Sequence, residues 1–114
     1  MKNNTLKIVD KFPYPGSRYK RLGPQSGEEF KDYLYKNLKS IYGAEFNKNL
    51  DNIVLIDLDG TQGYGSSFLE EGFGGLIRSG VPYKLVKSLR IKTEEEPELY
   101  EEIQEYIDDE YSKL

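Results

Sequence analysis

Cysteine and histidine are absent from this chain of 114 residues. Without cysteine, disulfides and thiol chemistry are excluded, and a cytoplasmic location is the simplest expectation. Without either residue no zinc site is expected, because zinc in proteins depends largely on their sulfur and nitrogen ligands. Catalysis by a histidine base is also excluded, so any proton transfer would use carboxylates, lysine or tyrosine.

Long apolar segments are absent as well. No run approaches the roughly 20 apolar residues of a membrane-spanning helix. Residues 1–7 lack the apolar stretch of a signal peptide. The chain is therefore expected to work without a membrane.

The charge of the chain is unevenly distributed. The formal net charge is −4, but residues 94–114 carry ten acidic residues and one lysine. The other residues carry fifteen lysines or arginines against ten acids, so the body of the chain is mildly basic. The acidic segment is interpreted as a solvated helix face, with an intramolecular partner and a protein-docking surface as alternatives.

One stretch combines a strand, a glycine-rich turn and a helix. Residues 53–58 are nearly all aliphatic and end at an Asp-Gly pair, which predicts a strand buried on both faces and then a turn. Three glycines permit a sharp turn here, namely Gly60, Gly63 and Gly65. Ser67 and Glu70 have the spacing of a capping box, so a helix is predicted from Ser67 to Arg78. Inside it, glycines indicate close packing on the sheet or room for a partner or ligand, at positions 72, 74 and 75.

The remaining elements follow from apolar periodicity and turn residues. Three further strands are predicted, over residues 5–12, 17–22 (an antiparallel edge strand) and 88–92. Three further helices are predicted, over residues 27–42, 82–87 and from about 95 with fraying after 107. The first of these has a capping box at Ser26 and Glu29. We expect one α/β domain over residues 1–114, with a small mixed sheet of about four strands and helices packed on it.

Patterns for nucleotides, metals and nucleic acids are incomplete. The turn lacks the Gly-Lys-Ser/Thr of a Walker loop and the Gly-x-Gly-x-x-Gly of dinucleotide folds, so nucleotide hydrolysis is not expected. Asp57 and Asp59 offer oxygen ligands for magnesium, but an Asx-turn at Asp59 and an ion pair or cap at Asp57 are the simpler explanation. Nucleic-acid binding through Arg18, Tyr19 and the next two cations is not expected, because the chain is acidic and the patch is small.

Ser66 and Ser67 stand where the turn meets the predicted helix. Unpaired amides and the macrodipole at a helix N-terminus favour an anion. A hydroxyl at this corner is accessible to the active site of another protein, and phosphorylation would add about −1.5 to −2 charge at neutral pH. The alternative is that both serines only cap the helix.

The stretch around the two serines resembles the STAS domains of sulfate transporters and bacterial anti-sigma-factor antagonists. In the antagonists a buried strand leads into Asp-Ser-Ser-Gly-Leu-Gly, and a partner kinase phosphorylates the first serine. Ser66 matches that serine, whereas Gly65 replaces the aspartate and Phe68 replaces the following glycine. A closer resemblance is to a STAS-like family of uncharacterised bacterial proteins, whose motifs recur over residues 15–19, 23–30 and 57–76.

This resemblance implies a STAS-like fold and a non-enzymatic bacterial signalling or interaction module. Such a module acts as a switch that a partner or phosphorylation controls, through the turn at 59–67 and the helix after it. The implied partner is a protein such as a histidine-kinase-like ATPase or a serine kinase. Ser66 and Ser67 are the candidate phosphoacceptors. The expected binding surface also includes Arg18, Tyr19, Asp57, Asp59, Thr61, Gly63, Tyr64, Gly65 and Phe68.

Two other functions stay open at this point. The first is a sensor of anions or nucleotides, in which the amides of residues 65–67 hold the anion and Arg18 is the counter-charge. The second is an enzyme built on Asp57, Asp59 and Tyr64. No cofactor is expected for the switch, and its geometry requires that Arg18 and Ser66 share one exposed, electropositive corner.

Overall fold

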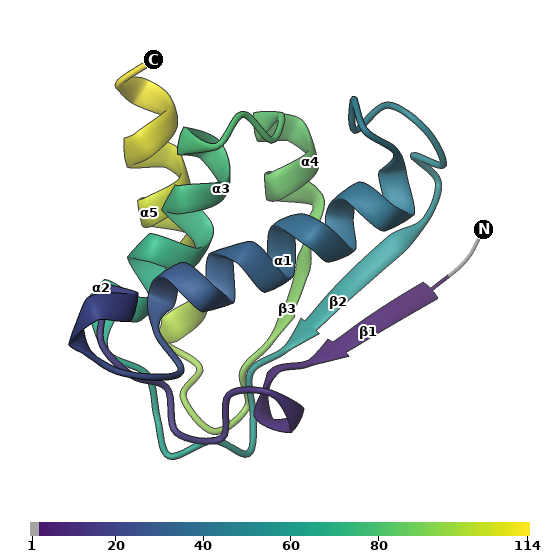
Figure 1. Cartoon of the computed structure of the whole chain (residues 1–114). Coiled ribbons are helices and arrows are strands. Elements are labelled where there is room, and N and C mark those ends of the chain that lie inside the picture. The colour runs from purple at the N-terminus through teal and green to yellow at the C-terminus, as the bar shows by residue number, and fades with distance from the viewer. Residues whose placement is uncertain (1–2) are drawn as a thin grey trace.

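The sheet is small and entirely parallel. The computed structural model describes residues 3–114, and its strands are β1 (Asn3–Lys7), β2 (Ile53–Asp57) and β3 (Arg90–Lys92). Their order in the sheet is β1-β2-β3, with Thr5 opposite Leu55 and Leu55 opposite Arg90 (Figure 1). An α/β fold with helices on a small sheet is confirmed, but the prediction of a mixed sheet of about four strands was wrong for the described residues.

Two predicted strands differ from the observed chain. Residues 17–22 form no strand; they run through a loop into one 3-10 turn, η2 (Lys20–Leu22). β1 is shorter than predicted because the chain turns into a second 3-10 segment, η1 (Ile8–Asp10), which places Ile8 in the core. The charge of residues 17–22 indicated an edge strand, but tertiary packing decided against pairing.

Helical connections follow from the parallel pairing, because parallel strands need long crossovers. α1 (Gly27–Tyr42) connects β1 to β2. A continuous helical stretch connects β2 towards β3; it consists of α2 (Ser66–Leu69), the π-helical segment η3 (Glu70–Gly74) and α3 (Gly75–Arg78). α4 (Tyr83–Ser88) follows before β3, and α5 (Leu99–Ser112) comes last.

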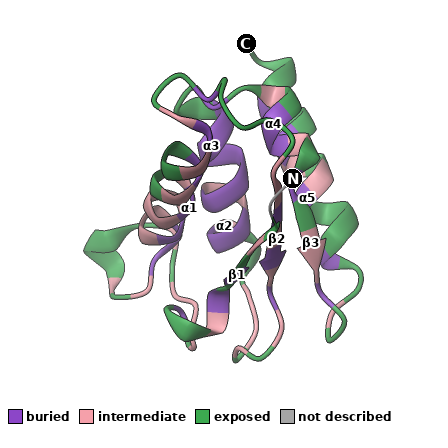
Figure 2. Ribbon diagram, turned by 90° about the vertical axis from the view of Figure 1, so that its right-hand side faces the viewer, coloured by how far each residue is buried: buried purple, intermediate pink, exposed green. Residues whose placement is uncertain are grey.

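The helices gather on one side of the sheet. Right-handed crossovers in the order β1-β2-β3 place successive helices on the same face. Figure 2 shows α1 and the α2–α3 stretch on one side of the strands, with α5 beyond β3. α5 packs on η3 and α3. No helix of the described residues is long and apolar enough to cross a bilayer.

α1 begins and ends as predicted. The Ser26 hydroxyl accepts the amide of Glu29, and the Glu29 carboxylate accepts the amide of Ser26. The helix ends before Gly43, whose φ of +87° favours glycine. Its buried face carries Phe30, which is also part of the aromatic core.

That aromatic core explains one of the internal glycines. The rings of Phe30 and Phe68 stack with centroids 4.8 Å apart; Phe12 meets both rings edge to face, and Phe73 meets Phe30 edge to face. A Cβ at Gly72 would lie 2.3 Å from the Phe30 ring. Gly72 therefore lets the π-helical backbone approach a ring of α1, whereas the sequence had left open packing on the sheet or room for a partner or ligand.

The second and last helices depart from prediction at their ends. The predicted capping box of Ser67 and Glu70 was wrong. The helix begins at Ser66, and its N-cap is Gly65, so no side-chain hydrogen bond caps it. α5 does not fray after Ile107 but continues to Ser112. In both cases a glutamate is engaged in a distant ion pair, which the local sequence does not reveal.

Candidate functional site

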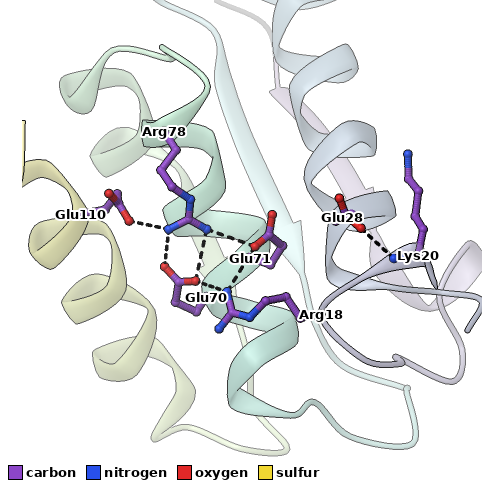
Figure 3. Close-up of polar contacts among 7 residues, drawn as sticks. All are labelled: Arg18, Lys20, Glu28, Glu70, Glu71, Arg78 and Glu110. Atoms are coloured by element: carbon purple, nitrogen blue, oxygen red, sulfur yellow. Dashed lines mark hydrogen bonds and ion pairs between the residues drawn. The ribbon is translucent and has the colours of Figure 1, made fainter. Parts of the chain in front are cut away.

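Five charged side chains from four parts of the chain meet beside the start of the π-helical segment. The Arg18 guanidinium contacts both Glu70 and Glu71, with 3.2 Å to the Glu71 carboxylate (Figure 3). Arg78 contacts the Glu70 carboxylate at 2.7 Å and Glu71 at 3.2 Å, and it also pairs with Glu110 of α5. We call these five residues the arginine–glutamate network; it ties the 17–19 loop, η3, α3 and α5 together.

The network holds two guanidinium groups and three carboxylates in close contact. Its bond with Glu70 raises the pKa of Arg18, although partial burial opposes this. The same partner raises the pKa of Arg78. Burial alone would raise the pKa of the Glu70 carboxyl, but the hydrogen bonds from Arg78 and Arg18 outweigh it and the pKa is lowered. Both arginines and Glu70 are thus held in their charged forms.

Gly74 makes part of this network sterically feasible. A Cβ at Gly74 would lie 2.4 Å from a carboxylate oxygen of Glu70. Without that Cβ, the Glu70 side chain folds along its own helix and reaches Arg78. The π-helical turn adds a residue to the local helix period, a feature that is frequent at functional sites.

The 17–19 loop is anchored to the start of α1 by backbone bonds. The amides of Gly27 and Glu28 donate to the carbonyls of Ser17 and Arg18, at 2.8 and 2.9 Å. Beyond them, the Lys20 amide donates to the Glu28 carboxylate at 2.7 Å (Figure 3). These bonds fix the direction in which Arg18 leaves the loop, while the ring of Tyr19 stays 40% exposed.

The carboxylates of Asp57 and Asp59 accept hydrogen bonds from backbone amides. The Asp57 carboxylate accepts the amide of Asp59 at 3.0 Å, which is an Asx-turn. The Asp59 carboxylate accepts the amides of Glu94 and Glu95 at 3.1 and 3.0 Å, and Lys92 lies 3.3 Å from it. The Glu95 amide is the main cause of the lowered pKa of Asp59. Both aspartates therefore hold the loop after β3 against the end of β2.

Asp57 and Asp59 do not form part of a metal-binding cluster among the described residues. Within residues 3–114, no group of three or more acidic or histidine side chains is placed to hold a cation. Lys92 Nζ instead lies 3.8 Å from Asp57 and 3.3 Å from Asp59 and supplies the positive charge. The turn rotates Asp59 so that both carboxylates reach the same lysine.

Tyr64 and Thr61 stabilise the glycine-rich turn itself. The Tyr64 hydroxyl donates to the carbonyl of Leu58 at 2.7 Å, and burial raises the pKa of this tyrosine. The Thr61 hydroxyl accepts the amide of Gly63 at 3.1 Å, where φ is +112°. With its proton held strongly and donated to the backbone, Tyr64 is poorly suited to act as a base.

The serine corner is open to solvent. Gly65 and Ser66 are exposed, and Ser67 is half-buried. Phe68 was predicted on the binding surface, but its ring is fully buried against Phe30, so that assignment was wrong. Of the two serines, Ser66 is the more accessible to another protein.

Arg18 and the serine corner belong to one side of the molecule. Ser66 precedes Glu70 by four residues, and side chains at this spacing are neighbours on a helix. Figure 3 shows Arg18 beside the first turn of the same helix, below Glu70. Arg18 therefore lies near the helix that begins at Ser66, but two carboxylates already occupy it, so it is not a free counter-charge for an anion and does not make the corner electropositive as expected.

Sequence reasoning missed the acidic half of this site. The sequence indicated only a capping role for Glu70 and no role for Glu71 and Glu110. One signal could have pointed to this site: Glu70 and Glu71 belong to the same long family motif as the two serines, and Arg18 belongs to a second family motif. Contacts between side chains that are about 50 residues apart in the sequence produce no periodic pattern from which they could be predicted.

Comparison with known proteins gives one match. The sequence model of a family described as a STAS-like domain of unknown function (DUF4325) matches residues 26–99. The match includes α1, the serine corner and η3, and it excludes Arg18 and Glu110. Neither curated proteins nor solved structures gave a match.

Proposed function

The chain belongs to this family of STAS-like domains, and on that premise we propose that it is a non-enzymatic signalling or interaction module. Its working surface is the turn at 59–67 together with the helix that starts at Ser66. A bacterial protein partner, such as a histidine-kinase-like ATPase or a serine kinase, docks on this surface. The exposed Ser66 hydroxyl is the position at which a phosphate controls that docking.

The observation that carries this proposal is an exposed hydroxyl on a rigid base. Ser66 is exposed, while the turn before it is fixed by Tyr64 and the helix after it by the arginine–glutamate network. A docking surface benefits from such preorganisation, because little conformational entropy is lost on binding. The acids near the corner are engaged with backbone amides or cations, which favours recognition over catalysis.

Phosphorylation would change the surface without unfolding it. At the first turn of a helix the added charge is favoured by the macrodipole and by free amides. One turn further on lie the carboxylates of Glu70 and Glu71, which contact Arg18 and Arg78. A partner that docks on the unmodified Ser66 hydroxyl would then meet a dianion, and its affinity would fall.

Pull-down from bacterial lysate tests the switch. Wild type, Ser66→Ala and Ser66→Asp are compared, with Ser40→Asp as the matched control because Ser40 is exposed on α1. We expect Ser66→Asp to lose the partner at least about tenfold, and Ser66→Ala and Ser40→Asp to retain it. Equal recovery with all four proteins would contradict the switch.

The second candidate function is an anion sensor, and one observation supports it. The first amides of a helix have no intrahelical acceptor, and those of Ser66 and Ser67 lie at the exposed corner. Thermal-shift measurements with inorganic phosphate and nucleotides separate the two functions. A ligand at 100 times its dissociation constant adds about 2.7 kcal/mol of stability, and absence of any shift would remove this candidate.

A further inference from the structure

One face of the sheet has no helical layer. Side chains alternate along a strand, so Val54 and Ile56 point to the buried side while Ile53 and Leu55 point away from it and are only half-buried. The strand register places exposed Thr5 and Arg90 beside Leu55. Figure 2 shows α1 and the α2–α3 stretch on the other side of the strands. Parallel sheets almost always have both faces covered, so this open face is unusual.

Two adjoining hollows lie on this face and share Leu55. One, of about 360 Å³, is lined by β1, β2 and Arg90. The other, of about 650 Å³, runs from Leu55 past Ile91 to Pro97 and Tyr100, at the start of α5. Tyr100 is 48% exposed. Together they form an apolar strip with a polar rim, which is typical of an interaction site.

The rim carries positive charge that is not neutralised internally. Lys7 and Arg90 are exposed, and no ion pair joins either to another residue in the described range 3–114. Lys92, in contrast, is engaged with Asp57 and Asp59. Glu94 also lines the larger hollow, where its exposed carboxylate lies 3.8 Å from Lys92, so the rim cations without an ion pair among the residues described are Lys7 on β1 and Arg90 beside the smaller hollow.

We propose that the open sheet face binds an amphipathic helix of a partner protein, with an apolar stripe flanked by acidic residues. The stripe would cover Ile53 and Leu55, and the acidic flanks would meet Lys7 and Arg90. A helix is the element that covers parallel sheets in α/β proteins. It would complete a three-layer arrangement from the two layers that the chain supplies.

A second copy of the chain is the less suitable occupant. Two-fold pairing brings the same surface of both copies together, so Lys7 and Arg90 would face the like charges of the other copy. Like charges disfavour such a contact. The open face also differs from the serine corner, so the partner helix binds independently of the state of Ser66.

Fluorescence anisotropy with two synthetic helical peptides tests the proposal. The acidic peptide has leucines at positions i, i+3, i+4 and i+7 with glutamates at the flanks, and the basic peptide has lysines in place of the glutamates. We expect the acidic peptide to bind the whole chain at least about tenfold more tightly. Leu55→Lys and Arg90→Glu should each weaken binding by about tenfold or more.

Controls separate this surface from the serine corner. Arg21→Glu reverses an exposed cation whose contact is the ring of Tyr19, and Ser66→Asp changes the corner; both should bind the acidic peptide as wild type does. Circular dichroism verifies the fold of every variant. Equal binding of both peptides, no binding, or unchanged binding by Leu55→Lys would overturn the proposal. So would a dimer in sedimentation that Leu55→Lys dissociates, since a second copy would then occupy the face.

Discussion

Arg78 reaches from the end of α3 to carboxylates on η3 and on α5. Its partner Glu110 has a side chain that is only 10% exposed. A carboxylate in such surroundings is costly unless a cation accompanies it. The pair therefore matters less for the attraction it provides than for the unpaired charge that its loss would leave behind.

We expect Arg78→Met to lower the free energy of unfolding by about 2–3 kcal/mol, because Glu110 loses its cation. The double variant Arg78→Met/Glu110→Leu should recover at least about 1 kcal/mol of this, since the buried Glu110 carboxylate is then gone while Glu70 and Glu71 keep Arg18. Urea denaturation measures both. Arg21→Met is the control and should stay within about 0.5 kcal/mol of wild type. A double variant less stable than Arg78→Met would contradict this explanation.

At the scale of single elements, the α2–α3 stretch shows why a helix carries so many glycines. Gly72 admits the ring of Phe30, and Gly74 admits the carboxylate of its own Glu70. Each glycine costs helix stability, roughly 0.5–1 kcal/mol against alanine. Packing and ion pairing offset that cost, and they also position the helix start that presents Ser66.

The charges at the two ends of α5 allow a test of how the helix macrodipole affects stability. Its first turn contains Glu101 and its last turn contains no basic residue, so acids near the C-terminus oppose the macrodipole. We expect Asp109→Lys to stabilise the protein by about 0.3–1 kcal/mol, and Glu101→Lys to destabilise it by a similar amount. Thermal denaturation at low salt measures both effects, which should shrink at about 1 M salt. Equal shifts in the same direction would exclude the dipole as their cause.

The whole molecule is a two-layer sandwich with its two proposed interaction surfaces in different places. The serine corner lies where β2 leads into the helix, and the open sheet face lies away from the helices (Figures 1 and 2). Carboxylates that are held by amides or cations recur across the structure. The pKa of Asp59 is lowered mainly by the Glu95 amide, and that of Asp108 mainly by the Tyr83 hydroxyl.

These carboxylates determine how stability should depend on pH. The lowered pKa values lie below the ordinary 3.8 of Asp59 and 4.5 of Glu70. Their contribution is therefore complete above those ordinary values and is lost as pH falls through the lowered ones. The chain has no histidine, so we expect the free energy of unfolding to stay level between about pH 5.5 and 7 and to fall below about pH 4. A step near pH 6.5 in urea titrations would contradict this.

The sequence by itself determined what local physics controls. Apolar periodicity and a capping box predicted α1, and an aliphatic run before glycines predicted β2 and the turn after it. The sequence also placed Ser66 and Ser67 at the helix start, but which of them faces solvent was decided by the structure. Arg18 and the serines were assigned to one surface from two separate motifs.

Only the tertiary structure decided the rest. The parallel three-stranded sheet, the missing edge strand and the open face depend on which segments pair over long distances, and pairing energies are not encoded in any one segment. The arginine–glutamate network is similar: Glu70 could cap its own helix, but Arg18 and Arg78 are close enough in the fold to compete for it. The Glu70 carboxylate pairs with two guanidinium groups instead of a backbone amide, because attraction between opposite charges is then added to the hydrogen bonds.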